Sequence, residues 1–313
     1  MKMKDIRWKR GDVEIVLDPD RKALVPLLRR TAQDPISVGW YPTDIAFDGA
    51  FMWVSNGSSN TVSKIDVSTN TLVATVGVGS YPFALAFDGR FIWVANFSGS
   101  TLSKIDITTN MVVAMVSVPG GASGVVFDGA FLWVSNENSN TVSKIDIAAN
   151  AVIATLWVGN NPRGIAFDGT SLWVANWFAS TVRRLDLASG LVVATLYTGS
   201  YPSDIAFDGA FIWVVNWVSN SVVKINATTN LMTAYIPVGS YPADVIFDGT
   251  FIWVTIGNAN TVRKIDMNTN MVVATVGAGR NPRSLAFDGA YLWVVNYVIS
   301  GSVRKIPVFA NYP

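Results

Sequence analysis

The tripeptide Phe-Asp-Gly recurs seven times along this chain of 313 residues, always at a spacing of forty. Its copies begin at Phe47, Phe87, Phe127, Phe167, Phe207, Phe247 and Phe287. A Trp-Val pair follows each copy at the same offset, at Trp53, Trp93, Trp133, Trp173, Trp213, Trp253 and Trp293. A fixed period of this length indicates that one small structural unit is repeated.

Each repeat divides into four short segments rich in β-branched and aromatic residues, separated by Gly, Asn, Ser and Pro. In the first repeat these segments are Asp44–Gly49, Phe51–Asn56, Thr61–Val67 and Leu72–Val78. Four-stranded units that recur about every forty residues are typical of β-propellers. We therefore predict an all-β fold: a seven-bladed β-propeller of four-stranded blades, occupying residues 34–313 as one domain.

The Phe-Asp-Gly segment predicts a tight turn between the first two strands of each blade. Gly49 accepts the positive φ that such a turn demands, and Asp48 can bond the backbone of its own turn. One carboxylate per turn is better explained by capping of the backbone than by a ring of calcium ligands, so no metal is expected. The longer connection Asp66–Thr71 offers Asp and Asn side chains for the same purpose.

The N-terminal part of the repeat region predicts how the ring closes. After Ser302–Pro307 the last repeat has no fourth strand, whereas Ile36 and Val38 match the fourth-strand residues Val76 and Val78. We therefore predict that the N-terminal strand completes the last blade, which leaves no unpaired edge. The seven repeated Trp side chains are predicted to pack between blades, since a buried aromatic ring covers about 150–250 Å².

The segment Phe91–Val118 resembles the YVTN-type β-propeller repeat, in which Tyr-Val-Thr-Asn stands where this chain has Trp93-Val94-Ala95-Asn96. The resemblance extends over residues 34–307 and implies the seven-bladed architecture of virginiamycin B lyase-like proteins. Those lyases are understood to use histidine and magnesium, and this chain has no histidine, so the resemblance does not imply their chemistry here. Other YVTN-like proteins are surface or exported binding proteins, which implies a binding role.

Composition excludes several classes of function. Without histidine or cysteine there is no imidazole base, thiol nucleophile or thiolate metal site. A net charge of +1 gives no basic surplus for nucleic acid, and no apolar run reaches the roughly 18 residues of a membrane span. We expect no cofactor. No secretion signal is evident, which fits a cytoplasmic protein or part of an assembly, or an extracellular protein whose leader was removed.

Aromatic residues that depart from the repeat are the first candidates for a site. The loops after the second strands carry Trp177, Phe178, Trp217 and Tyr297, and the loops between blades add Trp40 and Phe83. Both sets of loops are expected on one face, where they would suit a protein or glycan ligand. The alternative is that these rings only pack over neighbouring loops.

Charged residues break the repeat at the start of the innermost strands. Asp44, Asp204 and Asp244 occupy one position, and Arg163 and Arg283 lie one position earlier in their repeats. This arc would orient a polar ligand or a cation. The alternative is a set of mutual salt bridges at a solvated channel mouth.

From these features we predict a non-catalytic scaffold that binds a ligand or protein on the aromatic and charged face. The alternative is a histidine-free hydrolase or lyase that uses the aspartates. Such an enzyme needs two carboxyl groups at a defined separation with pKa values pushed apart.

Residues 1–33 belong to no repeat and carry 9 of the 23 basic residues but 5 of the 22 acidic ones. We expect a strand at Asp12–Leu17 and a short helix at Asp20–Arg30, interrupted at Pro26. This basic N-terminal extension would pack on the ring or attach it to a partner. In the second case the protein is a structural component of a larger assembly, such as a surface or phage particle.

Overall fold

The structure is a computed structural model that describes residues 7–9, 12–14 and 35–308. Within the N-terminal extension, strands β1 (Arg7–Lys9) and β2 (Asp12–Glu14) pair antiparallel. The strand expected at Asp12–Leu17 is therefore seen over its first three residues. Its remainder and the helix expected at Asp20–Arg30 lie outside the described residues.

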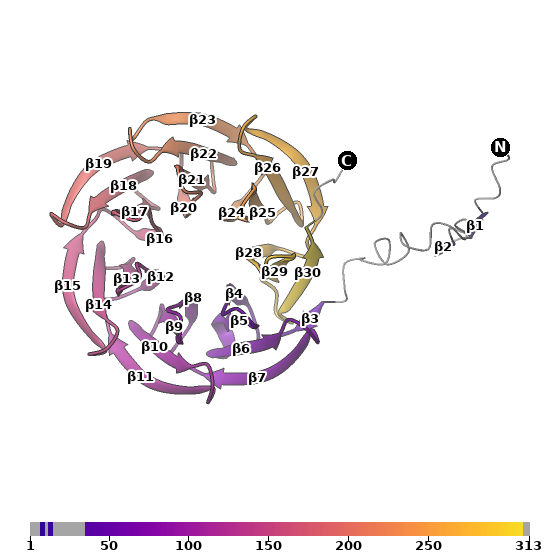
Figure 1. Ribbon diagram of the computed structural model, residues 1–313, viewed down its shortest axis with the longest axis horizontal. Coiled ribbons are helices and arrows are strands. Elements are labelled where there is room, and N and C mark those ends of the chain that lie inside the picture. Colours follow the sequence, from indigo (N-terminus) through magenta and orange to yellow (C-terminus); the bar gives the residue numbers. More distant parts are fainter. Residues whose placement is uncertain (1–6, 10–11, 15–34, 309–313) are drawn as a thin grey trace.

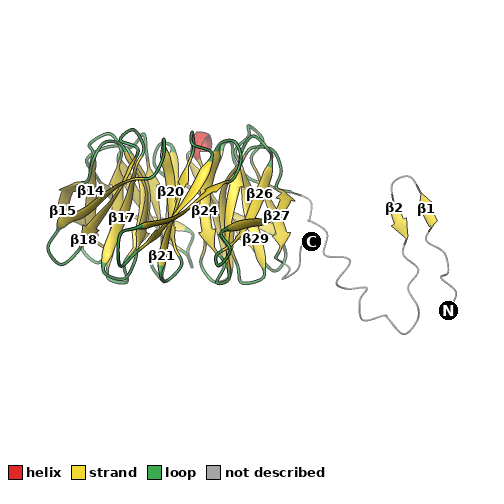
Figure 2. Ribbon diagram, turned by 90° about the horizontal axis from the view of Figure 1, so that it is seen from above, coloured by secondary structure: helices red, strands yellow, loops and turns green. Residues whose placement is uncertain are grey.

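Residues 35–308 form seven antiparallel sheets of four strands around a ring, so the predicted seven-bladed β-propeller is confirmed (Figure 1). In the first blade, β4 (Pro42–Phe47) is innermost, followed by β5 (Phe51–Asn56), β6 (Thr61–Asp66) and the outermost β7 (Thr71–Gly77). The short 3-10 helix η2 (Gly57–Ser59) follows β5. Seen from its edge the ring is a flat disc with loops on both faces (Figure 2).

The other blades repeat this order with nearly constant strand lengths. Their strands are β8 (Pro82–Phe87), β9 (Phe91–Asn96), β10 (Thr101–Asp106) and β11 (Met111–Ser117); β12 (Ala122–Phe127), β13 (Phe131–Asn136), β14 (Thr141–Asp146) and β15 (Ala151–Trp157); β16 (Pro162–Phe167), β17 (Ser171–Asn176), β18 (Thr181–Asp186) and β19 (Leu191–Tyr197); β20 (Pro202–Phe207), β21 (Phe211–Asn216), β22 (Ser221–Asn226) and β23 (Met232–Pro237); β24 (Pro242–Phe247), β25 (Phe251–Ile256), β26 (Thr261–Asp266) and β27 (Met271–Gly277); and β28 (Pro282–Phe287), β29 (Tyr291–Asn296) and β30 (Ser302–Pro307).

The ring closes by the predicted strand exchange. Strand β3 (Ile36–Ser37) pairs with β30, with Ile36 opposite Val303, so the two ends of the repeat region form one blade (Figure 1). The backbone N–H of Val38 extends the pairing by donating to the Gly301 carbonyl at 2.9 Å. Strand β3 has two residues where β7 has seven, so the outer strand of this blade is short.

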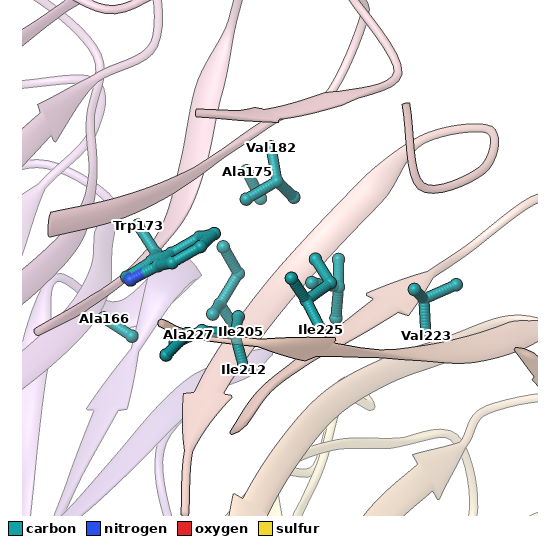
Figure 3. Close-up of a cluster of buried hydrophobic side chains, with 10 residues drawn as sticks. Ala166, Trp173, Ala175, Val182, Ile205, Ile212, Val223, Ile225 and Ala227 are labelled. Atoms are coloured by element: carbon teal, nitrogen blue, oxygen red, sulfur yellow. The ribbon is translucent and has the colours of Figure 1, made fainter. Parts of the chain in front are cut away.

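The repeated Trp side chains pack between blades as predicted. Trp173 is fully buried and lies in one cluster with Ile205 and Ile212 of the next blade (Figure 3). The Asp of each Phe-Asp-Gly turn caps its turn, also as predicted: Asp208 Oδ1 accepts the backbone N–H groups of Ala210 at 2.8 Å and Phe211 at 2.6 Å. The same carboxylate also fixes the tryptophan.

That second contact was not predicted from the sequence. The indole Nε1 of Trp213 donates to Asp208 Oδ2 at 2.8 Å, and the same bond is present in the other six repeats at 2.7–2.8 Å. Because a buried indole N–H needs an acceptor, one carboxylate both shapes the hairpin and satisfies the largest side chain of the core.

Candidate functional site

The loops before the first strand and after the second strand of each blade lie at the same end of the sheet, because Pro42 is paired with Asn56. Their equivalents in all blades surround the mouth of the central channel. The cavity there has a volume of about 140 Å³, and every one of the seven blades contributes to its wall. Eight of the eleven predicted site residues line it: Asp44, Phe83, Arg163, Trp177, Asp204, Trp217, Asp244 and Arg283.

The three aspartates bond backbone groups of the neighbouring blade rather than the arginines. Asp44 Oδ2 accepts the N–H of Leu85 at 2.7 Å. Asp204 Oδ2 accepts the N–H of Val245 at 3.2 Å, and Asp244 Oδ2 accepts that of Leu285 at 2.6 Å. These carboxylates therefore link the innermost strands of adjacent blades while they line the cavity.

Two of the aspartates also form a close couple. Asp204 shares a side-chain hydrogen bond with Asp244. Burial and the charge of Asp244 hold the pKa of Asp204 well above its usual range. Two carboxyl groups in contact bind a proton between them, since both cannot ionise cheaply at short range. A pair that holds this proton can both donate and accept a hydrogen bond.

Asp44 completes the acidic wall. Burial, reinforced by the charge of Asp244, raises the pKa of Asp44 to about 6, against the lowering effect of its hydrogen bonds. One of these comes from the hydroxyl of Ser284, which donates to Asp44 Oδ1 at 2.6 Å. The Asp44 side chain is flanked by protein yet partly exposed to the cavity, so its proton can exchange with solvent.

Arg163 forms a salt bridge with a glutamate, whereas the salt-bridge alternative paired it with one of the three aspartates. Its Nε donates to Glu137 Oε2 at 3.1 Å and its Nη2 to Oε1 at 3.0 Å. The guanidinium also lies over the Trp177 ring, 3.8 Å from the centroid. Glu137 was missed by the sequence analysis, although it is the one charged residue in the seven loops that follow the second strands.

Arg283 lies beside aromatic rings instead of beside a carboxylate. Its guanidinium lies 5.5 Å from the ring centroids of both Phe83 and Tyr297. Within residues 35–308 no carboxylate oxygen comes within 4.0 Å of it. An open hollow of about 450 Å³ adjoins the cavity here, lined by Tyr81, Phe83, Phe97, Ser98, Glu137, Arg163 and Arg283.

The predicted aromatic residues fall into two groups. Trp177 and Trp217 lie side by side with centroids 5.5 Å apart, and Trp217 also contacts Tyr241 at 4.6 Å. Tyr297 contacts Tyr81 through their hydroxyls, which are 3.0 Å apart. The structure thus brings the aromatic and charged residues together around one opening.

Two predicted residues lie apart from this opening. Phe178 packs against Tyr201 at 5.9 Å and is 65% exposed. Trp40 is 60% exposed and is absent from the walls of both the cavity and the hollow. Neither side chain contributes to the cavity wall. Tyr297, the third predicted residue outside the wall, lies next to it through its contacts with Arg283 and Tyr81.

The available donors limit the chemistry of the site. Among the described residues no three Asp or Glu side chains are grouped closely enough to hold a metal ion. The opening therefore offers a carboxyl pair that holds a proton, an unpaired guanidinium and an aromatic wall.

In the part of the chain that the structure describes, no helix is long and apolar enough to cross a membrane.

Comparison with known proteins identifies the fold of the chain. The family model described as YNCE-like beta-propeller matches residues 15–172. No curated protein matches the sequence. Among solved structures, Kuenenia stuttgartiensis hydrazine synthase is similar with a TM-score of 0.78 and 22% identity, over 87% of this chain and 96% of that chain. At this level of identity the likeness shows the fold alone.

Proposed function

The chain belongs to the YNCE-like β-propeller family, and we propose that it binds a small polar ligand at the channel mouth without transforming it. The observation that carries this proposal is the convergence of Arg283, the Asp204–Asp244 pair and Trp217 on one cavity. Small-molecule sites combine an apolar wall with a few placed polar groups in the same way.

The unfavourable placement of charged and acidic groups at this opening supports a role in binding. A charged group that is surrounded by protein without a counterion is unfavourable, and so is a pair of carboxyl groups in contact. Arg283 is half-buried in the cavity wall without a carboxylate partner among residues 35–308, and Asp204 and Asp244 share a hydrogen bond. A ligand that satisfies these groups regains that free energy on binding.

The dimensions favour a small ligand over a protein surface. A cavity of about 140 Å³ accommodates a few heavy atoms, and the adjoining hollow of about 450 Å³ admits the rest of a ligand of metabolite size. A terminal sugar of a glycan would fit as well, with Trp217 offering a flat apolar face. The YVTN-type resemblance, with its exported binding proteins, agrees with this role.

The experiment is a thermal-shift screen of the full chain at pH 7 against monosaccharides, amino acids, organic acids and sugar phosphates, together with a glycan array. A ligand that binds the folded state raises the melting temperature by an amount that grows with the logarithm of its concentration above Kd. A reproducible, concentration-dependent shift from any of these classes supports the proposal. Flat responses throughout, with capture only of intact proteins, would reject it.

A second candidate function rests on the Asp204–Asp244 couple. Carboxyl groups whose pKa values are pushed apart are the arrangement that acid–base catalysis requires. A hydrolase or lyase would use the protonated group as acid and its partner as base. Turnover of chromogenic glycosides or esters, lost in Asp204→Asn and Asp244→Asn alike, would establish this role, and binding of the same compounds without turnover would exclude it.

A further inference from the structure

Arg283 is the one cavity-lining arginine without an acidic partner among residues 35–308. Its guanidinium lies 5.5 Å from the ring centroids of both Phe83 and Tyr297. Burial and the positive charge of Arg163 lower the pKa of Arg283, the direction expected when a cation lacks compensation. Arginine nevertheless stays charged in proteins, so Arg283 remains a cation without an ion-pair partner among residues 35–308.

The hollow beside Arg283 also carries an excess of one positive charge. Glu137 is the only acidic residue of its wall, and both Glu137 oxygens are occupied by Arg163. The negative charge of Glu137 is therefore balanced by Arg163. Arg283 is left as the free charge that faces the hollow.

The aspartates deeper in the cavity do not cancel this charge by contact. Asp44 is bonded by the Leu85 N–H and the Ser284 hydroxyl. Asp204 and Asp244 bond each other and hold a proton. Asp244 is the acid whose charge reaches Arg283, yet no ion pair joins them.

We propose that Arg283 anchors an oxyanion, a carboxylate or phosphate group, at one end of the ligand. This inference rests on the proposed function and adds the charge of the ligand and the place where that charge binds. The planar fork of a guanidinium matches both oxyanions with two parallel hydrogen bonds. The contacts with Phe83 and Tyr297 restrict the side chain before the ligand arrives, which lowers the entropic cost of binding.

The tyrosine hydroxyls beside Arg283 supply a further donor. Tyr81 and Tyr297 are 3.0 Å apart at their oxygens, so one hydroxyl donates to the other and one proton remains free. Burial, followed by the hydrogen bond with Tyr297, raises the pKa of Tyr81 to about 12, so this hydroxyl keeps its proton at neutral pH. The carboxyl pair then receives the hydroxyl or amino end of the same ligand.

The experiment titrates the full chain with inorganic phosphate and, separately, with malonate, while sodium chloride holds ionic strength constant. The heat of binding to the unaltered protein, measured by isothermal titration calorimetry, is expected to saturate with at least one anion. Arg283→Gln should lose this saturable heat of binding. Arg280→Gln, which removes an exposed charge from the same inter-blade loop, should retain it.

Each outcome bears on the inference. Saturation by phosphate alone or malonate alone assigns the class of oxyanion. Absence of a saturable heat of binding in the unaltered protein, or equal binding by Arg283→Gln, overturns it. If Arg283→Gln does not fold, Arg283→Lys takes its place: it keeps the charge but loses the fork, so saturation should require a higher anion concentration.

The result separates this inference from the proposed function. If ligands found by the screen are neutral and phosphate and malonate have no effect, the oxyanion anchor fails and the binding role stands. If the anions saturate through Arg283 while the screen finds no ligand, the anion site stands and the proposed function fails.

Discussion

Asp204 and Asp244 come from neighbouring blades and share one side-chain hydrogen bond at the channel mouth. Each also accepts a backbone N–H from the next blade, Asp204 from Val245 and Asp244 from Leu285. The couple is therefore fixed by the ring itself, and its spacing cannot relax unless the blades move apart.

Asp244→Asn should lower the pKa of Asp204 toward its usual range without restoring it completely. Burial is the largest cause of the raised pKa and remains in the variant, whereas the charge of Asp244 is removed. Carboxyl carbon chemical shifts followed by NMR across a pH titration measure this. Asp146→Asn, in an exposed turn, is the control and should leave Asp204 unchanged. An unaltered pKa in Asp244→Asn would mean that the couple is not electrostatically linked.

Asp44→Asn should make stability less dependent on pH between about 4 and 6. The unfolded chain ionises Asp44 near 3.8 and the folded chain near 6, so the folded state binds more protons in this window. Asp44 therefore destabilises the fold as pH rises through the window, by roughly 1–3 kcal/mol once screening by cavity water is allowed for.

Urea unfolding at pH 4.5 and pH 7 tests this difference. An Asn side chain can keep both the Leu85 and the Ser284 hydrogen bonds, because the serine hydroxyl can accept as well as donate. The variant should gain stability over the unaltered protein at pH 7 and little at pH 4.5. The same difference at both pH values would show that ionisation of Asp44 is not the cause.

Asp208→Ala should lower the free energy of unfolding by about 3 kcal/mol. It removes two backbone hydrogen bonds and leaves the buried indole N–H of Trp213 without its acceptor. Asp66→Ala is the matched control, since it also loses bonds in a turn but at an exposed site without a tryptophan, and should lower the free energy of unfolding much less. Chemical denaturation measures both, and equal losses would contradict the double role of Asp208.

A chain that begins at Tyr41 should melt roughly 10 °C below one that begins at Pro35. Only the shorter chain lacks β3, and with it the packing of Ile36 and Val38 against Val303. The comparison also tests the proposed boundary between the N-terminal extension and the propeller, because the chain from Pro35 should melt close to the full chain. Indistinguishable melting of the two truncated chains would contradict closure by β3.

The fold was predictable because the positions that recur in all seven repeats show where each strand and turn begins and ends. Seven copies of one pattern fix the strands and turns, and the missing fourth strand of the last repeat requires Ile36 and Val38 to supply it. The capping role of Asp48 was predictable from turn chemistry, which is local. Its bond to the Trp53 indole was not, since that depends on how the hairpin bends.

The contacts of the site were less predictable than its residues. Eight of the predicted residues do line one cavity, because strand register places them at the same end of every blade. Their partners depend on the distance between blades, which the repeat pattern does not contain. Arg163 thus pairs with Glu137 of the preceding blade, and Asp44 bonds Leu85 of the following one.

The most direct test of the proposed binding site compares two tryptophans on the same face. Isothermal titration with a ligand from the screen is performed on Trp217→Ala, which alters the cavity wall, and on Trp40→Ala, which alters an exposed ring outside it. The account predicts at least about tenfold weaker binding for Trp217→Ala and a change within about twofold for Trp40→Ala. Equal affinities for the two variants, or a loss confined to Trp40→Ala, would contradict a ligand site at the channel mouth.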